Sequence, residues 1–244
     1  FGLGVIIIGN LISSMIIDFQ TLVIIRFLTG LLGHGVGFAL GVAAIGRTNN
    51  PDKNFAYSVA SQVIMGSITA LVVPITIAKY GIAGMCVPAM IIALLTLLFV
   101  SKLRDPAKNN VQESSAATPK GILILPLIGL FIMVIWQMGV GPFFNNLVPF
   151  GLSINLKGDE IGTALFLSTG LSIMGPLAAS ALASKINRSV AISSALILQI
   201  IIVLSFQGDM DWYGFTIRAI LFQTSWNFAG PFLMGMVANV DKTG

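Results

Sequence analysis

Charged side chains are scarce in this chain. Its 244 residues include 13 Lys and Arg and 9 Asp and Glu, so charged residues make up 9% of the sequence, against about 25% in soluble domains. Hydrophobic residues make up 56% and the mean hydropathy is +0.95. Too few polar groups remain to cover a surface in water. This excludes a soluble enzyme, a nucleic-acid-binding domain and a disordered tail.

Cysteine and histidine are also nearly absent. The single cysteine, Cys86, excludes an intrachain disulfide and a metal cluster built from thiols, and we interpret it as a small buried hydrophobe. His34 is the only histidine. An intramembrane enzyme would need a nucleophile with its base, or paired His and Asp residues. We therefore expect no enzyme activity, no metal and no cofactor.

Long apolar runs dominate what is present. A helix needs about 20 predominantly apolar residues to cross a bilayer, and the runs are too long and too little alternating for barrel strands. The sequence predicts an all-α membrane protein with eight visible transmembrane helices, at residues 1–17, 20–45, 55–78, 82–101, 121–144, 161–183, 189–206 and 212–237.

The basic residues predict the orientation. One set of loops between the predicted spans contains most of them, namely Arg47, Lys53, Lys102, Arg104, Lys108, Lys120, Lys185, Arg188 and Lys242. Lys79 and Lys157 lie in the other set. By the positive-inside rule the richer side is cytoplasmic, so the net charge of +4 reflects orientation and not a nucleic-acid partner. We expect an integral protein of the plasma (inner) membrane.

One polar segment divides the sequence. The stretch 101–120 is rich in Ser, Asn, Lys and Pro, and it predicts a flexible cytoplasmic linker at 105–119, with a regulatory role as the alternative. The halves on either side are then 1–104 and 120–244, each with four visible helices.

The two halves resemble each other in one place. Asp18 precedes Arg26 by eight residues, and Asp209 and Asp211 precede Arg218 by nine and seven. An offset of 192 aligns the two arginines about two turns inside the second and the eighth predicted span. Repeats of this kind are typical of secondary transporters.

With these features the chain resembles the major facilitator superfamily of transporters. Leu22, Arg26, Thr29 and Gly30 fit the family's fourth-helix motif, and the segment 180–188 is similar to its loop motif between helices eight and nine. The resemblance implies a twelve-helix fold in two halves, of which this chain is a fragment covering helices three to ten. The fifth-helix motif is eroded, because Val73 stands where the family has glycine before Pro74, and this leaves the direction of transport open.

Polar residues inside the predicted spans are the candidate functional residues, because charges at bilayer depth are costly and often functional. The resemblance implies that Arg26 takes part in proton coupling, and a structural arginine is the alternative. His34 could carry protons, or it could be a neutral imidazole bonded to a helix carbonyl. At 100° per residue Gly30, Gly33 and Gly37 share the face of Arg26, which predicts close helix packing.

The second half contains the candidate substrate-binding residues. Arg218, Phe222 and Trp226 share one helix face and suit an organic anion, with a snorkelling arginine above a packing face as the alternative. The segment 136–150 combines Gly141 and Pro142 with the amides Gln137, Asn145 and Asn146. It predicts either a gating hinge with amides facing substrate or a kink that serves packing alone.

The leading functional hypothesis is a secondary active transporter. It would move a small organic solute by alternating access with a proton as the coupling ion, and we expect a monomer in the lipid bilayer. Uptake of an organic anion and efflux of a hydrophobic drug both stay open. The alternative is a non-transporting membrane protein or an inactive truncated product. No Asp or Glu lies inside any predicted span, so any acidic coupling residue would belong to helices outside this sequence.

Overall fold

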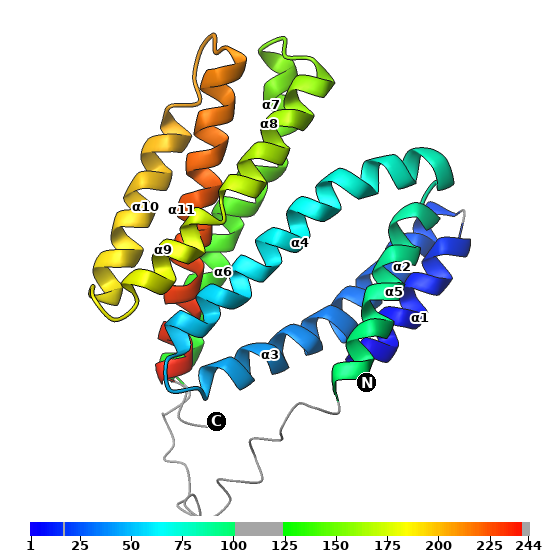
Figure 1. Ribbon diagram of the computed structural model, residues 1–244, viewed down its shortest axis with the longest axis horizontal. Coiled ribbons are helices and arrows are strands. Elements are labelled where there is room, and N and C mark those ends of the chain that lie inside the picture. Colours follow the sequence, from blue (N-terminus) through cyan, green and yellow to red (C-terminus); the bar gives the residue numbers. More distant parts are fainter. Residues whose placement is uncertain (17, 101–123, 241–244) are drawn as a thin grey trace, which may run out of the picture. The chain divides into compact units, whose positions relative to one another are not determined.

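The computed structural model describes residues 1–16, 18–100 and 124–240, and these ranges contain helices and no strand (Figure 1). The first helices are α1 (Gly2–Met15), α2 (Phe19–Leu28), the π-helical turn η1 (Thr29–Gly35), α3 (Val36–Gly46), α4 (Pro51–Tyr80) and α5 (Ala83–Val100). The later ones are α6 (Ile124–Asn145), α7 (Leu147–Ser153), α8 (Gly158–Leu171), α9 (Met174–Leu182), α10 (Arg188–Leu204) and α11 (Trp212–Val240). The predicted linker 105–119 lies outside the described residues.

Among the described residues five helical stretches are long and apolar enough to cross a bilayer, which is consistent with an all-α integral membrane protein. They are Phe19–Gly46, Pro51–Tyr80, Ala83–Val100, Leu127–Ser153 and Gly158–Leu182. The helices α1 and α10 are apolar but shorter. Most of each of the eight predicted spans is helical where it is described, but the span predicted at 161–183 is divided into α8 and α9 by a turn at Ser172 and Ile173, and the span predicted at 55–78 begins earlier, at Pro51.

The chain forms two compact units. Unit 1 contains residues 1–44 and 69–117, and unit 2 contains residues 45–68 and 118–244. The first half of α4 therefore packs with the later helices, although the segment 45–68 was assigned to the N-terminal half on sequence. Small residues allow this packing, since the fully buried Ala56 belongs to one hydrophobic cluster with Ala179, Ala191 and Phe232.

In unit 1, α1 packs against α5 and η1. Glycines permit the close approach. A Cβ atom added at Gly33 would lie 2.7 Å from Ile6 Cγ1, and one added at Gly9 would overlap the side chain of Thr29. The side chains of Asn10 and Ser13 are buried in the same contact.

In unit 2, α11 is the central helix and packs against α6, α8, α9 and α10. Its buried side chains include Phe215, Phe222 and Phe232. Gly175 at the start of α9 lies so close to α11 that a Cβ atom there would overlap the carbonyl of Thr224. The core of this unit is thus organised around a single long helix.

Candidate functional site

Arg26 reaches from α2 to buried polar groups of α1. Its Nε donates to Ser13 Oγ at 3.0 Å and its Nη2 donates to Asn10 Oδ1 at 3.0 Å. Nη2 also lies 3.6 Å from Cys86 Sγ on α5. These partners are neutral, and among the described residues no carboxylate forms an ion pair with Arg26. The guanidinium is therefore held by hydrogen-bond acceptors that carry no charge.

Helix capping sets the position of Arg26. Asp18 is the N-cap of α2, where its Oδ2 accepts from the Thr21 backbone N–H at 2.8 Å and from Thr21 Oγ1 at 2.7 Å. The backbone hydrogen bond from Thr21, followed by the bond from its side chain, lowers the pKa of Asp18. The helix therefore begins at a fixed residue, and Arg26 follows two turns later.

Arg218 repeats this arrangement in unit 2. Its Nε donates to Ser205 Oγ at 3.0 Å and its Nη1 donates to the Gly214 carbonyl at 3.0 Å. Asp211 accepts from the Gly214 N–H at 2.8 Å, as Asp18 does in α2. In both units the arginine bonds the serine thirteen positions before it, at the end of the preceding helix. We call each such arginine–serine pair a clasp.

The two clasps follow the internal repeat. Ser13 with Ser205 and Arg26 with Arg218 are both related by the offset of 192 that aligns the arginines. Neither serine was singled out on sequence. Extending the alignment thirteen residues backwards from each arginine would have found both.

His34 and the glycines near it lie on or beside the π-helical turn. His34 is exposed. Gly33 is buried against Ile6 of α1, whereas Cβ atoms added at Gly30 and Gly37 would meet nothing within 4 Å among the described residues. A π turn changes the angular spacing of successive residues, so the face expected at 100° per residue does not continue past Thr29.

The segment around Pro142 forms a break between two helices. Pro142 lies inside α6, which ends at Asn145, and α7 begins after Asn146. Asn146 Nδ2 donates to the Pro142 carbonyl at 2.8 Å, so this amide supplies a hydrogen bond to a backbone carbonyl at the break. Gln137 and Asn145 are exposed and Gly141 is half-buried. The structure therefore places these amides at the surface of the described residues.

Phe222 and Trp226 join an aromatic cluster with residues next to this break. The Phe222 ring lies 4.4 Å from that of Phe143 and 6.4 Å from that of Trp226, which in turn lies 5.8 Å from Phe144. Phe222 is only 1% exposed and belongs to the core, while Trp226 is half-buried. Arg218 lies one turn before Phe222 on α11.

A buried polar network joins α8 to α11. Gln223 Nε2 donates to Ser168 Oγ, and Thr169 Oγ1 donates to Gln223 Oε1 at 3.3 Å. One turn further, Asn227 Nδ2 donates to Ser172 Oγ at 2.8 Å. Neither serine, Ser168 nor Ser172, was singled out on sequence. Both pairs have a spacing of four, which places each pair on one helix face and could have indicated the contact.

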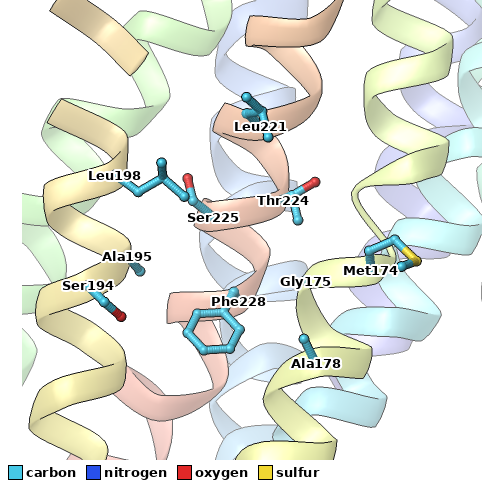
Figure 2. A pocket seen from close by; sticks show the side chains of 10 residues that line it. All are labelled: Met174, Gly175, Ala178, Ser194, Ala195, Leu198, Leu221, Thr224, Ser225 and Phe228. Atoms are coloured by element: carbon cyan, nitrogen blue, oxygen red, sulfur yellow. The ribbon is translucent and has the colours of Figure 1, made fainter. Parts of the chain in front are cut away.

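A small cavity lies between α9, α10 and α11. Its volume is about 210 Å³, and Figure 2 shows side chains of the three helices around it. Ser225 and Ser194 line it, but their hydroxyls donate to carbonyls of their own helices, Phe222 O at 2.8 Å and Ala191 O at 3.0 Å. The remaining lining is mainly apolar, including Phe228, so this cavity suits a small apolar group.

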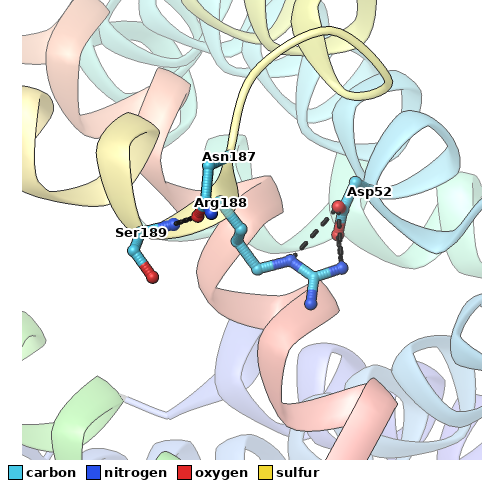
Figure 3. A network of polar contacts seen from close by, with 4 residues as sticks. All are labelled: Asp52, Asn187, Arg188 and Ser189. Atoms are coloured by element: carbon cyan, nitrogen blue, oxygen red, sulfur yellow. Dashed lines mark hydrogen bonds and ion pairs between the residues drawn. The ribbon is translucent and has the colours of Figure 1, made fainter.

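An ion pair joins the start of α4 to the start of α10 (Figure 3). Arg188 donates through Nη2 to both oxygens of Asp52, at 2.8 and 3.0 Å, and through Nε to Oδ2 at 3.2 Å. Gly235 of α11 packs against Asp52 so closely that a Cβ atom there would overlap the carboxylate. Both charged residues had been assigned to loops. The structure places them in the first turns of helices, where Asp52 also meets the positive end of the α4 dipole.

The described residues contain no group of three His, Cys, Asp or Glu side chains able to hold a metal ion. The candidate residues offer hydrogen-bond donors and acceptors, the two arginines of the clasps, and aromatic rings. Comparison with family models, with curated proteins and with solved structures finds no match to this chain.

Proposed function

We propose that this protein is a secondary active transporter, which moves a small organic solute by alternating access with a proton as the coupling ion. The observation that carries the proposal is the repeated clasp. Each unit has a capped helix that holds an arginine two turns inside, bonded to a serine of the preceding helix. Internal repeats built around charged groups in apolar helices are typical of transporters.

Uncompensated charge supports an anionic solute. Arg26 and Arg218 bond only neutral groups among the described residues, so each guanidinium keeps a net charge that a carboxylate could neutralise. In the proposal Arg218 binds the solute, with Trp226 and Phe222 forming an aromatic wall and with Gln137, Asn145 and Asn146 lining the path.

Coupling is assigned to unit 1. Arg26 and the exposed His34 lie on one continuous helical stretch, Arg26 just before the π-helical turn and His34 within it. Such turns are frequent at functional sites. Gly33 packs against α1, while the open spaces beside Gly30 and Gly37 leave room for a neighbouring helix during the transport cycle. At the break after Gly141 and Pro142 the helix direction can change.

The test is flux in proteoliposomes that contain the full chain and an entrapped pH-sensitive dye. Benzoate probes uptake of an organic anion, and tetraphenylphosphonium probes transport of a hydrophobic drug. Each response is measured as the excess over protein-free vesicles, because both compounds also cross a bilayer unaided. We expect benzoate to drive proton entry, Arg218→Gln to abolish it, and Arg26→Gln to separate benzoate flux from proton flux. Arg47→Gln is the matched control, because Arg47 is exposed in the turn after α3.

The outcomes separate the hypotheses. Proton movement with tetraphenylphosphonium alone would replace anion uptake by drug transport. Vesicles that respond to neither probe, or that respond equally in all three variants, would contradict the proposal and favour a non-transporting membrane protein.

A further inference from the structure

Gln199 of α10 has a buried amide that is only half satisfied. Its side chain is 7% exposed, and its Oε1 accepts from Trp136 Nε1 of α6 at 3.1 Å. The indole N–H can only donate, so the oxygen must face Trp136, and this fixes the orientation of the amide. Gln199 Nε2 is buried without a hydrogen-bond partner among the described residues. Leaving such a donor unpaired is unfavourable.

The amide lines a cavity of about 350 Å³ between α6 and α10. Trp136 and Phe143 of α6 and Phe222 of α11 supply aromatic walls, and Gly139 leaves an open space at the α6 side. The volume lies in the range of small-molecule sites, which combine apolar walls with few polar groups. Ile200 is 58% exposed and Leu204 is 62% exposed at the rim. Within unit 2 the cavity is therefore reached from the apolar outer surface.

The depth of Gln199 limits what the ligand can be. Gln199 follows Arg188 by eleven residues of the same helix, which is about 16 Å at the helical rise. The hydrocarbon core is about 30 Å thick, so the amide lies near its middle. Ester carbonyls of phospholipids lie at the edges of the core and would not reach it.

We propose that this cavity binds a neutral aromatic molecule of the membrane phase that carries one carbonyl acceptor. The carbonyl accepts from Gln199 Nε2, and the rings pack against Trp136, Phe143 and Phe222. Nε2 is covered by neighbouring atoms, so the ligand reaches it when a neighbouring side chain turns aside. The site shares the Phe222 ring with the aromatic wall of the proposed transport path, but neither arginine clasp lines it, so it is a second binding place beside that path.

Benzophenone is a suitable probe, because it is neutral, aromatic and has one ketone. Under near-ultraviolet light its carbonyl oxygen takes a hydrogen atom from a nearby C–H group, and the two carbon radicals join as a new C–C bond. The adduct therefore has the combined mass of protein and probe and can be located in peptides. The full chain in lipid nanodiscs is irradiated over a range of benzophenone concentrations.

We expect saturable labelling within residues 135–143 and 196–204. Gln199→Met should weaken the apparent affinity about fivefold, from loss of one hydrogen bond. Gly139→Leu should abolish saturable labelling by filling the cavity. Gly162→Leu is the matched control, because its added side chain also meets open space but lies in α8 outside the cavity. The tryptophan fluorescence transition on heating verifies that each variant is folded.

Competition tests the role of the carbonyl. Diphenylmethane has the same two rings without the acceptor, and it competes with benzophenone for the site. Its apparent affinity should be about fivefold weaker than that of benzophenone in the wild-type protein, and the two affinities should be equal in Gln199→Met. Equal competition in the wild type, or labelling spread without saturation over all helices, would overturn the proposal.

Discussion

Replacing Arg26 by alanine tests whether the clasp stabilises unit 1. The change removes two hydrogen bonds from a charged donor, to Ser13 and Asn10, each 3.0 Å long. It also leaves Asn10 Oδ1 without its charged donor, in a residue that is 1% exposed. Hydrogen bonds to charged groups contribute about 1.5–3 kcal/mol each, and relief from desolvating the guanidinium offsets part of this loss. We expect a net destabilisation of about 2 kcal/mol.

The chain carries its own probes for the two units. Its only cysteine, Cys86, is fully buried in unit 1 beside Arg26. Its three tryptophans, Trp136, Trp212 and Trp226, all belong to unit 2. Reaction of Cys86 with a thiol reagent therefore reports opening of unit 1, and tryptophan fluorescence reports unit 2.

In this assay Arg26→Ala should speed labelling of Cys86 about 30-fold, the factor that corresponds to about 2 kcal/mol. The fluorescence transition of unit 2 should not move. Arg26→Lys should fall between, since an ammonium group can reach one acceptor but lacks the planar fork. Arg218→Ala is the matched control and should lower the fluorescence transition without changing Cys86 labelling. Labelling of Arg26→Ala within twofold of wild type would refute the reasoning.

Three further predictions concern other contacts. The first is a double-mutant cycle of Asp52→Ala and Arg188→Ala, in which tryptophan fluorescence measures the free energy of unfolding. The coupling energy should be about 1–2 kcal/mol, because Arg188 contacts both carboxylate oxygens but the pair is partly exposed. Additive effects of the two single changes would contradict this. Gly33→Ala should speed Cys86 labelling, because the added Cβ would crowd Ile6. Gly30→Ala places its Cβ in open space, so it should slow the labelling or leave it unchanged. Faster labelling in Gly30→Ala than in Gly33→Ala would be inconsistent with the packing. The pKa of Asp18 is lowered in the folded protein, so its contribution is present above the ordinary aspartate range and lost as the pH falls through the folded pKa. Circular dichroism melts should therefore show a loss of stability on acidification that is smaller in Asp18→Asn, and identical pH profiles would rule out this cap.

The helices could be predicted because their signal is local. Apolar runs of bilayer length and the polar clusters between them lie in continuous sequence, and most of each predicted span is helical where it is described. The boundaries were less accurate. Asp52 was assigned to a loop, because a charge ends an apolar run in the sequence, yet it lies in the first turn of α4. An ion pair to Arg188, 136 positions away, compensates its charge.

The candidate residues show where such reasoning stops. The offset of 192 was visible from Arg26 and Arg218, but their serine acceptors were not recognised until the helices were placed beside each other. The shared face of Gly30, Gly33 and Gly37 was predicted on the spacing of a regular α-helix. The turn at Thr29–Gly35 is π-helical, so Gly33 packs against α1 while Gly30 does not. Nothing in hydropathy indicates such a turn.

The sequence by itself determined the class of protein and the positions of its helices, because scarcity of charge and the length of apolar runs are properties of the chain alone. It also determined the repeat that relates the two arginines. Only the tertiary structure decided what each polar side chain bonds. Ser13 accepts a hydrogen bond from Arg26, Asp52 forms an ion pair with Arg188, and Gln199 accepts a hydrogen bond from Trp136 while its own Nε2 stays unpaired among the described residues. These choices depend on which helix faces meet and how closely small residues let them approach, and residues far apart in the chain set both.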